Sequence, residues 1–415
     1  MIVENKEKFT GQSSPNELKK KTIDPKKLEK WYQKKPEKNI QAPTSNNELM
    51  LDILKMREEQ NGIKLGEKKI VRKKKKITTT DAFSSVDAHA WLVKNLNKDK
   101  TAASLMLTDL LKKGFLLNLT SSKLVYRDKD TYKWRVDERS PPLNMVTSFN
   151  DSEPPFPLIT YLLEELINIQ SLNLKASNNS IVIDYNSFCN SPEFVKFQKS
   201  TCRLSSLNLK DLKSKEMKLC FWINVYNLLF LHSLCKNPPP NNLKSTFFTN
   251  SSYLIGGNSF SLHDIYHGLL RGNTKNNPFG NPAFSSGDER FSHSVFDNEK
   301  NIDPRIHFVL FTGTTSSPNF QIMYPETCDA QLTKAVEDSL EEDFSIVLSK
   351  NFIQIPHIFH TYRSDFGKDF PSCFQFINKF IPEHLQRAAR LMINANSNIK
   401  PKDFSWEICA PKIIS

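Results

Sequence analysis

Apolar and polar positions divide the chain into an unpatterned front and a periodic remainder. Residues 1–44 are mostly Lys, Glu, Asn, Pro and Ser, a composition that buries too little apolar surface to offset the entropy of the chain. Apolar residues then recur at helical spacing behind a capping box formed by Ser45 and Glu48. We therefore expect a disordered basic region over residues 1–79 that contains one short helix near 46–61.

The hydrophobic pattern becomes compact between residues 80 and 138. Two apolar stripes at helical spacing are followed by two runs of strand character, and Gly114 can end the second helix. The pattern predicts, in order, a helix at 83–92, a helix at 102–111, a strand at 115–119 and a strand at 125–136. Two helices followed by hairpin material predict a small winged-helix-like module.

A proline-punctuated linker over residues 139–156 leads to a longer periodic region, which we expect to form a domain over 157–410. Its helix at about 215–235 has apolar residues almost all round its axis, so it should lie at the centre of a core. Further expected elements are a helix at 158–169, a strand pair turning at 256–257, a helix capped by Ser261, a buried strand at 306–311, a helix at 329–340, a hairpin at 345–355 and a helix ending at Gly367. This irregular succession predicts an α+β fold.

Charge is distributed unevenly along the chain. Residues 1–80 contain 21 Lys or Arg against 11 Asp or Glu (net +10), residues 81–140 contain 11 against 8 (+3), and residues 141–415 contain 25 against 26 (−1). A basic front on a nearly neutral body predicts an acidic partner for the front of the protein and says nothing about the body.

The densest basic run is predicted to contact an acidic lipid surface, where each basic residue contributes roughly 1 kcal/mol. It consists of Lys68, Lys69, Arg72, Lys73, Lys74, Lys75 and Lys76. A solvated linker and a nuclear import or nucleic-acid signal are the alternatives. Because no base-stacking aromatic residue is interleaved with these lysines, nucleic acid is not the expected partner.

The compact module resembles a known recruitment domain. It is similar to the DEP domain at residues 81–85, 90–93, 102–111, 113–115, 126–128 and 132–135, with Ser84 or Ser85 where that family often has glycine. The resemblance implies a non-catalytic module that brings its host to membranes through receptors or acidic lipids. Winged-helix DNA binding is the alternative, but the second helix carries only Lys112 and Lys113 at its end and lacks a base-reading set of side chains.

The long domain is similar to the domain of unknown function 547 family over roughly residues 155–410. The resemblance rests on residues 221–227, 253–257, 261–265, 303–310, 313, 317–318, 355–356, 364–367 and 404–406. It implies a fold only, because that family has no established reaction. Thr312 and Ser317 stand where many members have cysteines, and His267 stands where an acidic residue is common, so no thiol or metal role is expected for that loop.

Polar residues of the long domain predict either a pocket or a buried hydrogen-bond network. The candidates are Asn224, Asn227, His232, Arg271, Asp303, Arg305 and His307. Arg305 offers a planar fork for an anion or for a structural carboxylate such as Asp303. A buried amide without hydrogen bonds costs about 1–3 kcal/mol, so a structural network is the first expectation and a ligand pocket the second.

A catalytic grouping of Cys220, His307 and Asp303 is the strongest enzymatic alternative. We expect Cys220 to be structural instead, because it lies about two turns inside an apolar helix, where a thiolate is disfavoured. A metal site would have to gather His232, His263, His267 and His307. His263 and His267 are four apart on one helix face, but Ile265 and Tyr266 stand between them where a catalytic acid would be needed, so neither a metal nor another cofactor is expected.

Cysteine usage and hydropathy indicate the compartment. All seven cysteines follow residue 188 without a C-x-x-C pair, which fits a reducing environment. No apolar run approaches the roughly 20 residues that a bilayer requires, and the first ten residues show neither a signal-peptide pattern nor a myristoylation glycine. We expect a cytoplasmic scaffold of intracellular signal transduction that attaches peripherally to an anionic membrane or a membrane receptor. An uncharacterised hydrolase-like enzyme and a nuclear factor are the alternatives.

Overall fold

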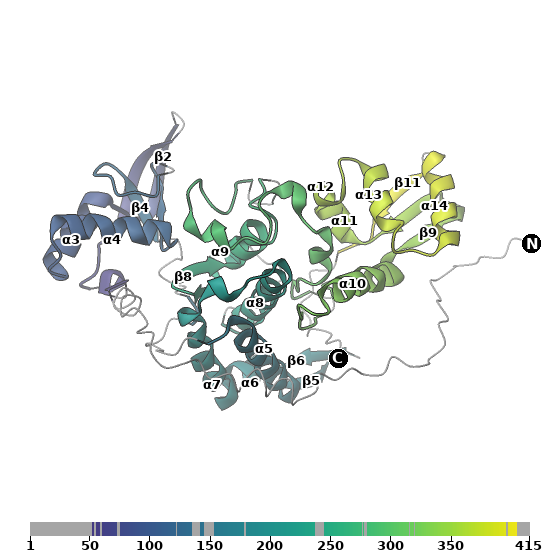
Figure 1. Cartoon of the computed structure of the whole chain (residues 1–415), viewed down its shortest axis with the longest axis horizontal. Helices are drawn as coiled ribbons and strands as arrows, with labels where there is room; N and C mark the ends of the chain where they lie inside the picture. Colours follow the sequence, from purple (N-terminus) through teal and green to yellow (C-terminus); the bar gives the residue numbers. More distant parts are fainter. Residues whose placement is uncertain are drawn as a thin grey trace, which may run out of the picture.

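The computed structural model describes residues 52–404 except 54, 59, 73–74, 122, 135–141, 145–152, 178–179, 237–244, 276, 278–279, 315, 319 and 396. The expected disorder over 1–44 and the first part of the helix expected near 46–61 lie outside these residues. Figure 1 shows an elongated arrangement, with an N-terminal module at one end, long helices in the middle and a small C-terminal sheet at the other end.

The N-terminal module (residues 52–134) combines two helices with one antiparallel sheet. Its elements are β1 (Gly66–Arg72), β2 (Lys75–Ser84), α3 (Ser85–Asn95), α4 (Lys100–Lys112), β3 (Leu116–Asn118) and β4 (Thr131–Trp134). The strands lie in the order β1-β2-β4-β3. Ser84 and Asp99 cap the two helices through their side chains, and a core around Phe83, Leu107 and Tyr132 holds helices and sheet together. Both expected helices and both expected strands are present, with shifted ends.

The ordered chain begins well before residue 80, which corrects the expected disorder over 1–79. Strands β1 and β2 form a hairpin over 66–84, with Ile70 opposite Ile77 and Arg72 opposite Lys75. Upstream of it, residues 52, 53 and 55–57 are helical, and Ile53 and Met56 are buried in the module core. The run of five basic residues between Val71 and Ile77 concealed the strand signal, because the β-branched residues on either side of it are too few to show an alternating pattern.

The central part of the large domain is built around one long helix, α8 (Lys215–Lys236), which is buried from Leu219 to Cys235, in agreement with its apolar circumference. Helix α5 (Pro155–Leu172) packs against it and against α7 (Pro192–Thr201). Shorter elements complete this part: β5 (Leu174–Ser177), β6 (Ser180–Ile183), α6 (Tyr185–Asn190), η1 (Cys202–Ser206), η2 (Leu209–Asp211) and α9 (Ser245–Asn250). One continuous core extends from Leu158 to Met392.

A tight hairpin follows α9. Strands β7 (Ser252–Ile255) and β8 (Asn258–Ser261) turn at Gly256 and Gly257, which both have positive φ angles that favour glycine. Ser261 and Asp264 then form the expected capping box, with reciprocal bonds of 3.0 and 3.1 Å between backbone N–H groups and side-chain oxygens. The capped segment η3 (Asp264–Leu269) has the wider hydrogen-bond pattern of a π-helix.

The apolar run at 306–311 is buried as expected but is not a strand, which corrects that prediction. It starts with η6 (Pro304–Phe308), a 3₁₀ helix capped by the Asp303 side chain and followed by a turn at Val309 and a bend at Leu310. Pro304 removes a backbone donor and presets a helical φ at the first position. A continuous apolar run by itself does not separate a buried strand from other buried backbone.

The remaining elements form the C-terminal part of the large domain. They are η4 (Glu289–His293), η5 (Glu299–Asn301), α10 (Cys328–Asp343), β9 (Ser345–Val347), η7 (Leu348–Lys350), β10 (Phe352–Ile355), α11 (His357–Thr361), α12 (Arg363–Phe366), α13 (Phe370–Ile377), α14 (Glu383–Asn394) and β11 (Asn398–Pro401). The expected hairpin at 345–355 is β9 with β10, and β11 adds to β10 in parallel. The architecture of the described residues is therefore mixed α+β, as the pattern predicts.

The N-terminal module packs directly on the large domain. Leu254 of β7 belongs to the module's core cluster, and the backbone N–H of Ser259 in β8 donates to the carbonyl of Lys113 at 3.3 Å. Lys112 pairs with Glu289 at 2.9 Å. Part of the expected linker is anchored as well, since Asn144 exchanges two hydrogen bonds of 2.8 Å with the backbone of Leu254.

Candidate functional site

Both predicted asparagines of α8 bind backbone groups of distant chain segments. Asn224 donates to the carbonyl of Met323 and accepts from its N–H, both at 2.9 Å. Asn227 donates to the carbonyl of Val309 at 3.0 Å and accepts from the N–H of Phe311 at 2.9 Å. Each amide thus satisfies backbone groups of an irregular segment that is distant in the sequence. Both are fully buried, so they hold segments to α8 and line no open surface.

His232, a third candidate on α8, lies apart from the others. Its Nδ1 is 2.7 Å from the Tyr253 hydroxyl, and its ring packs edge-on against Phe194 and Phe197. The side chain is fully buried. These contacts link α8 to α7 and β7, which is a structural role.

Arg271 and His307 meet at Asp365, a residue that the sequence reasoning did not select. The guanidinium of Arg271 donates to both Asp365 oxygens, at 2.6 and 2.8 Å. His307 Nε2 lies 2.9 Å from Asp365 Oδ2, and its Nδ1 lies 2.7 Å from the Tyr266 hydroxyl. Both ring nitrogens of His307 are therefore engaged. The only sequence signal for Asp365 was its place in the 364–367 segment of the family resemblance.

Two more rings extend this buried network. His267 Nδ1 lies 2.8 Å from Nη1 of Arg271, and the Tyr362 ring stacks on His307 with centroids 4.1 Å apart. Burial, reinforced by the charge of Arg271, lowers the pKa of His267 well below its ordinary value. Although burial opposes it, hydrogen bonds from His307 and Arg271 hold the pKa of Asp365 well below the usual range. The Arg271–Asp365 pair is charged, and it ties the turn after η3 to α12.

Asp303 and Arg305 form a separate, half-buried cluster. Arg305 donates to Asp303 and to Asp329 at 2.8 Å through the same nitrogen, Nη2, and to the Thr333 hydroxyl at 2.9 Å. The hydrogen bonds that Arg305 donates to these carboxylates, above all to Asp303, raise its pKa. The fork is thus occupied by carboxylates of the protein and joins η6 to the first turns of α10.

The catalytic grouping of Cys220, His307 and Asp303 is not assembled. Cys220 is fully buried in the core around α8, whereas His307 uses its two nitrogens for Tyr266 and Asp365. Within the part of the chain that the structure describes, no group of three or more His, Cys, Asp or Glu side chains could hold a metal ion. Asn224, Arg305 and His307 therefore do not converge on one open cleft.

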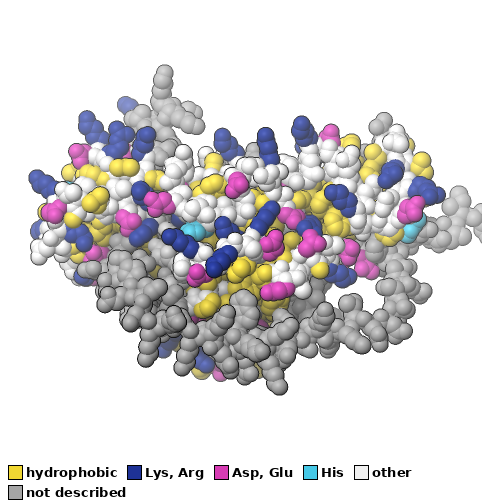
Figure 2. All heavy atoms as spheres, viewed as in Figure 1, with side chains coloured by type: hydrophobic (Ala, Val, Ile, Leu, Met, Phe, Trp, Pro, Cys, Tyr) yellow, Lys and Arg dark blue, Asp and Glu magenta, His cyan; other side chains and the backbone are white. Residues whose placement is uncertain are grey.

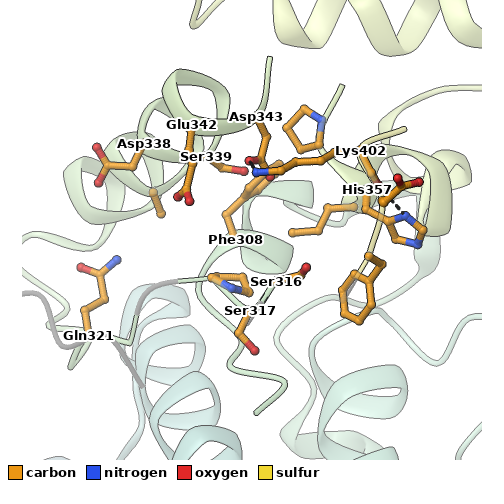
Figure 3. Close-up of a pocket in the computed structure, with 16 residues that line it drawn as sticks. Phe308, Ser316, Ser317, Gln321, Asp338, Ser339, Glu342, Asp343, His357 and Lys402 are labelled. Atoms are coloured by element: carbon orange, nitrogen blue, oxygen red, sulfur yellow. Dashed lines mark hydrogen bonds and ion pairs between the residues drawn. The ribbon is translucent and has the colours of Figure 1, made fainter. Parts of the chain in front are cut away.

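An open cleft does lie beside α10, and none of the predicted residues lines it. Its walls come from α10, the loop before it, the start of α11 and the segment after β11, as Figure 3 shows. The lining residues are Phe308, Ser316, Ser317, Pro318, Gln321, Ala335, Asp338, Ser339, Glu342, Asp343, Pro356, His357, Ile358, Lys402, Asp403 and Phe404. They are scattered over nearly a hundred positions of the sequence, so no local motif announces the cleft.

The cleft is polar, and acidic groups outnumber basic ones. Asp338 pairs with Lys334 at 2.7 Å, and Lys402 pairs with Asp343 across the cleft. Burial lowers the pKa of His357, whose Nδ1 faces the carbonyl of Lys402 at 3.3 Å. The imidazole is therefore neutral at pH 7, and the carboxylates set the sign of the local potential.

The basic run at 68–76 lies on the β1–β2 hairpin. Lys69 and Lys76 are exposed, and the register places them on the same face, since Lys69 lies opposite Thr78 and Lys76 lies opposite Val71. Lys68 forms a 3.3 Å pair with Asp87. Arg72 and Lys75 pair as backbone neighbours at the end of the hairpin, while Lys73 and Lys74 lie outside the described residues. Figure 2 shows basic side chains over this end of the molecule.

Comparison with known proteins supports one of the two resemblances. No helix among the described residues is long and apolar enough to cross a membrane. No curated protein matches the chain, and the similarity of residues 80–138 to the DEP domain stays a prediction. Residues 209–340, from η2 to near the end of α10, match the family model described as "Protein of unknown function, DUF547", so this part of the chain is a DUF547 domain.

Proposed function

We propose that this protein is a non-catalytic adaptor of signal transduction that attaches to anionic membrane surfaces through its N-terminal module and presents the large domain there. The observation that carries the proposal is the ordered basic hairpin. Between Gly66 and Trp134 the sequence has 16 Lys or Arg against 7 Asp or Glu, a net charge of +9. The strand register fixes Lys69 and Lys76 on one exposed face.

An ordered hairpin suits this task better than a free basic tail. Each basic residue near an anionic surface contributes roughly 1 kcal/mol, and a paired backbone loses less conformational entropy on binding than a flexible chain does. The contacts of Lys112 with Glu289 and of Lys113 with Ser259 connect the module to the large domain. Attachment of the hairpin would therefore also orient the large domain relative to the membrane.

The inner polar groups of the large domain favour a structural platform over an enzyme. The asparagines of α8 bind backbone, and Arg271 with His307 is neutralised by the buried Asp365. A group that is already hydrogen-bonded within the protein must break those bonds before it can act on a substrate. These contacts account for the polar residues of the pattern without any reaction.

Vesicle co-sedimentation of the full chain tests the proposal. Phosphatidylserine vesicles should bind the protein at low salt, and binding should weaken at physiological ionic strength. Replacing Lys69 and Lys76 by Ala should weaken binding by roughly thirtyfold, since two contributions of about 1 kcal/mol each are lost. The matched control replaces two exposed lysines of the large domain, Lys350 and Lys368, and should leave binding unchanged.

Two outcomes would contradict the adaptor proposal. One is equal loss of vesicle binding in the hairpin and control variants, which would mean that only overall charge matters. The other is preference for duplex DNA over phosphatidylserine vesicles at matched salt, which would favour a nucleic-acid role for the basic module.

A further inference from the structure

One threonine lies beside both exposed lysines of the β1–β2 hairpin. Thr78 is exposed, as are Lys69 and Lys76. The register places Thr78 directly opposite Lys69, and Lys76 precedes it by two residues on the same strand, so the three side chains lie on one face of the hairpin. We propose that Thr78 is a phosphorylation site whose phosphate neutralises this face and releases it from anionic membranes. This regulation rests on the membrane attachment proposed above.

The face that carries Thr78 is turned toward solvent. The opposite face of the hairpin carries Ile70, which is buried, and Lys68, which pairs with Asp87 of α3 at 3.3 Å. Because successive side chains of a strand alternate between faces, the burial of Ile70 fixes the outward direction of Lys69 and Thr78. A protein kinase therefore reaches the Thr78 hydroxyl from solvent.

Thr78 differs from the two threonines that follow it. The Thr79 hydroxyl donates to the carbonyl of Thr80 at 3.4 Å, and the Thr80 hydroxyl donates to the carboxylate of Asp81 at 3.2 Å. Within the described part of the chain, the Thr78 hydroxyl has no hydrogen bond to another protein group. It can therefore accept a phosphoryl group without first breaking a hydrogen bond.

The sequence before Thr78 suits a kinase with an acidic substrate groove. Lys75 and Lys76 stand three and two positions before it, at the end of a run of five basic residues, and kinases select substrates partly by charge. Among the described strands, residues 75–79 of β2 pair with β1 alone, because β4 pairs with β2 only from Ala82 onward. A two-stranded ribbon is marginally stable by itself, so local opening gives the kinase the extended segment that it binds.

The transfer uses a nucleoside triphosphate as its co-reactant. The Thr78 oxygen attacks the γ-phosphorus of ATP, a new O–P bond forms, the bond to the β–γ bridging oxygen breaks, and ADP leaves with that electron pair. The hydroxyl proton passes to the catalytic base of the kinase. The product carries a charge of about −1.5 to −2 at pH 7.

That charge matches the two lysines beside it. Directly opposite residues of paired strands have Cβ atoms about 4.5–5.5 Å apart, and residues two apart on one strand are separated by about 7 Å. A phosphate on Thr78 is therefore within reach of both Lys69 and Lys76, and it cancels the charge that they offer to the membrane. We expect the phosphorylated chain to bind phosphatidylserine vesicles roughly thirtyfold more weakly, the same loss as when both lysines are replaced.

Phosphopeptide mapping of the full chain tests the site. The protein is incubated with ATP and the catalytic domain of protein kinase C, digested with trypsin and analysed by mass spectrometry. We expect a phosphate in peptide 77–94, with fragmentation assigning it to Thr78, and none in this peptide of the Thr78→Val variant. A peptide without phosphate, or a phosphate assigned to Thr79 or Thr80 instead, would overturn the proposal.

Vesicle co-sedimentation then tests the release. Phosphatidylserine vesicles are mixed with the unmodified chain, the phosphorylated chain and two variants. Thr78→Glu should weaken binding by roughly fivefold, because its single charge offsets about one lysine. Thr79→Glu is the matched control, since it places the same charge on the opposite face of the hairpin, and it should weaken binding by less than about twofold.

The outcomes distinguish this release from the attachment itself. A chain that binds vesicles equally well before and after phosphorylation refutes the release and leaves the adaptor function standing. A chain that binds no vesicles in either state refutes the adaptor function, and the release with it. Equal losses in Thr78→Glu and Thr79→Glu would show that only net charge matters, which also overturns the proposed role of Thr78.

Discussion

Gly114, at the end of the module's helix α4, touches the guanidinium group of Arg290 in the large domain. A Cβ atom at Gly114 would lie within 2.7 Å of the Cζ, Nη1 and Nε atoms of Arg290. Arg290 is fully buried and pairs with Asp288 at 2.7 Å and with Asp264 at 3.2 Å. The glycine that ends α4 is thus also the point at which the module meets a buried ionic cluster.

Replacing Gly114 by Ala should destabilise the protein by about 2–4 kcal/mol. Its φ of +77° costs an L residue about 1 kcal/mol, and the added methyl group must displace Arg290 from its carboxylate partners, which is expensive for a buried charge. Urea unfolding measures the change. Gly287→Ala is the matched control, because Gly287 has a φ of +83° but no atom within 4 Å of an added Cβ. Equal losses of stability in the two variants would show that displacement of Arg290 does not contribute to the effect of Gly114→Ala.

Replacing Asp365 by Asn should cost about 3–5 kcal/mol, because it leaves the buried Arg271 without its counter-charge. Asp329→Asn is the control. It removes a carboxylate that lies 2.8 Å from Arg305, but Asp329 is 87% exposed, so the free energy of unfolding should fall by less than about 1 kcal/mol. Thermal or urea unfolding of both variants compares them. A small effect at Asp365 would contradict the structural assignment of the Arg271–Asp365–His307 network.

Replacing Asn227 by Ala should destabilise the protein by about 2–4 kcal/mol, because the carbonyl of Val309 and the N–H of Phe311 both lose a partner in a dry environment. Asn208→Ala, at an exposed cap of η2, should cost about 1 kcal/mol or less. Equilibrium unfolding separates the two. A stable Asn227→Ala protein with a gained or lost ligand affinity would instead point to a pocket.

Stability should fall as the pH drops below about 6.5. Burial, together with Lys218, lowers the pKa of His293 to about 4, whereas the unfolded chain titrates near 6.5. Between these values the unfolded state binds a proton that the folded state does not, so acid favours unfolding, with a slope of at most about 1.4 kcal/mol per pH unit for each such group. Buried His267 and His307, whose pKa values are also lowered, act in the same direction.

The His293→Gln variant isolates one of these groups. The bond from the Trp222 indole goes to the backbone carbonyl of residue 293 and survives the substitution. Urea unfolding at pH 7, 6 and 5 gives the free energy of unfolding as a function of pH. Its slope should be smaller in the variant than in the unaltered protein by up to about 1 kcal/mol per pH unit. His384→Gln, at an exposed position, serves as the control. An unchanged slope in His293→Gln would show that this imidazole is protonated in the folded state.

Local pattern was sufficient for the elements whose signals lie within a few residues of one another. The apolar circumference of α8 predicted a central helix, the Gly256–Gly257 pair predicted the β7–β8 turn, and Ser261 with Asp264 predicted a capping box. Each of these signals acts over about one helical turn or one hairpin, so no distant contact was needed to read it. The similarity to DUF547 over 209–340 could also be predicted from short local segments, such as residues 221–227 and 253–257.

The contacts that decide between a site and a scaffold depend on residues far apart in the chain. Arg271 and Asp365 are separated by 94 positions, and Asn224 binds a backbone segment 99 positions away. The basic hairpin is ordered because β2 pairs with β4, about 50 residues later, although its lysines resemble an unstructured linker. By itself the sequence determined the central helix α8, the β7–β8 turn, the capping box at Ser261 and the charge distribution of this protein. Only the tertiary structure determined which polar groups are hydrogen-bonded or ion-paired with one another and where an open cleft remains. Such bonds form between neighbours in space, irrespective of their order along the chain.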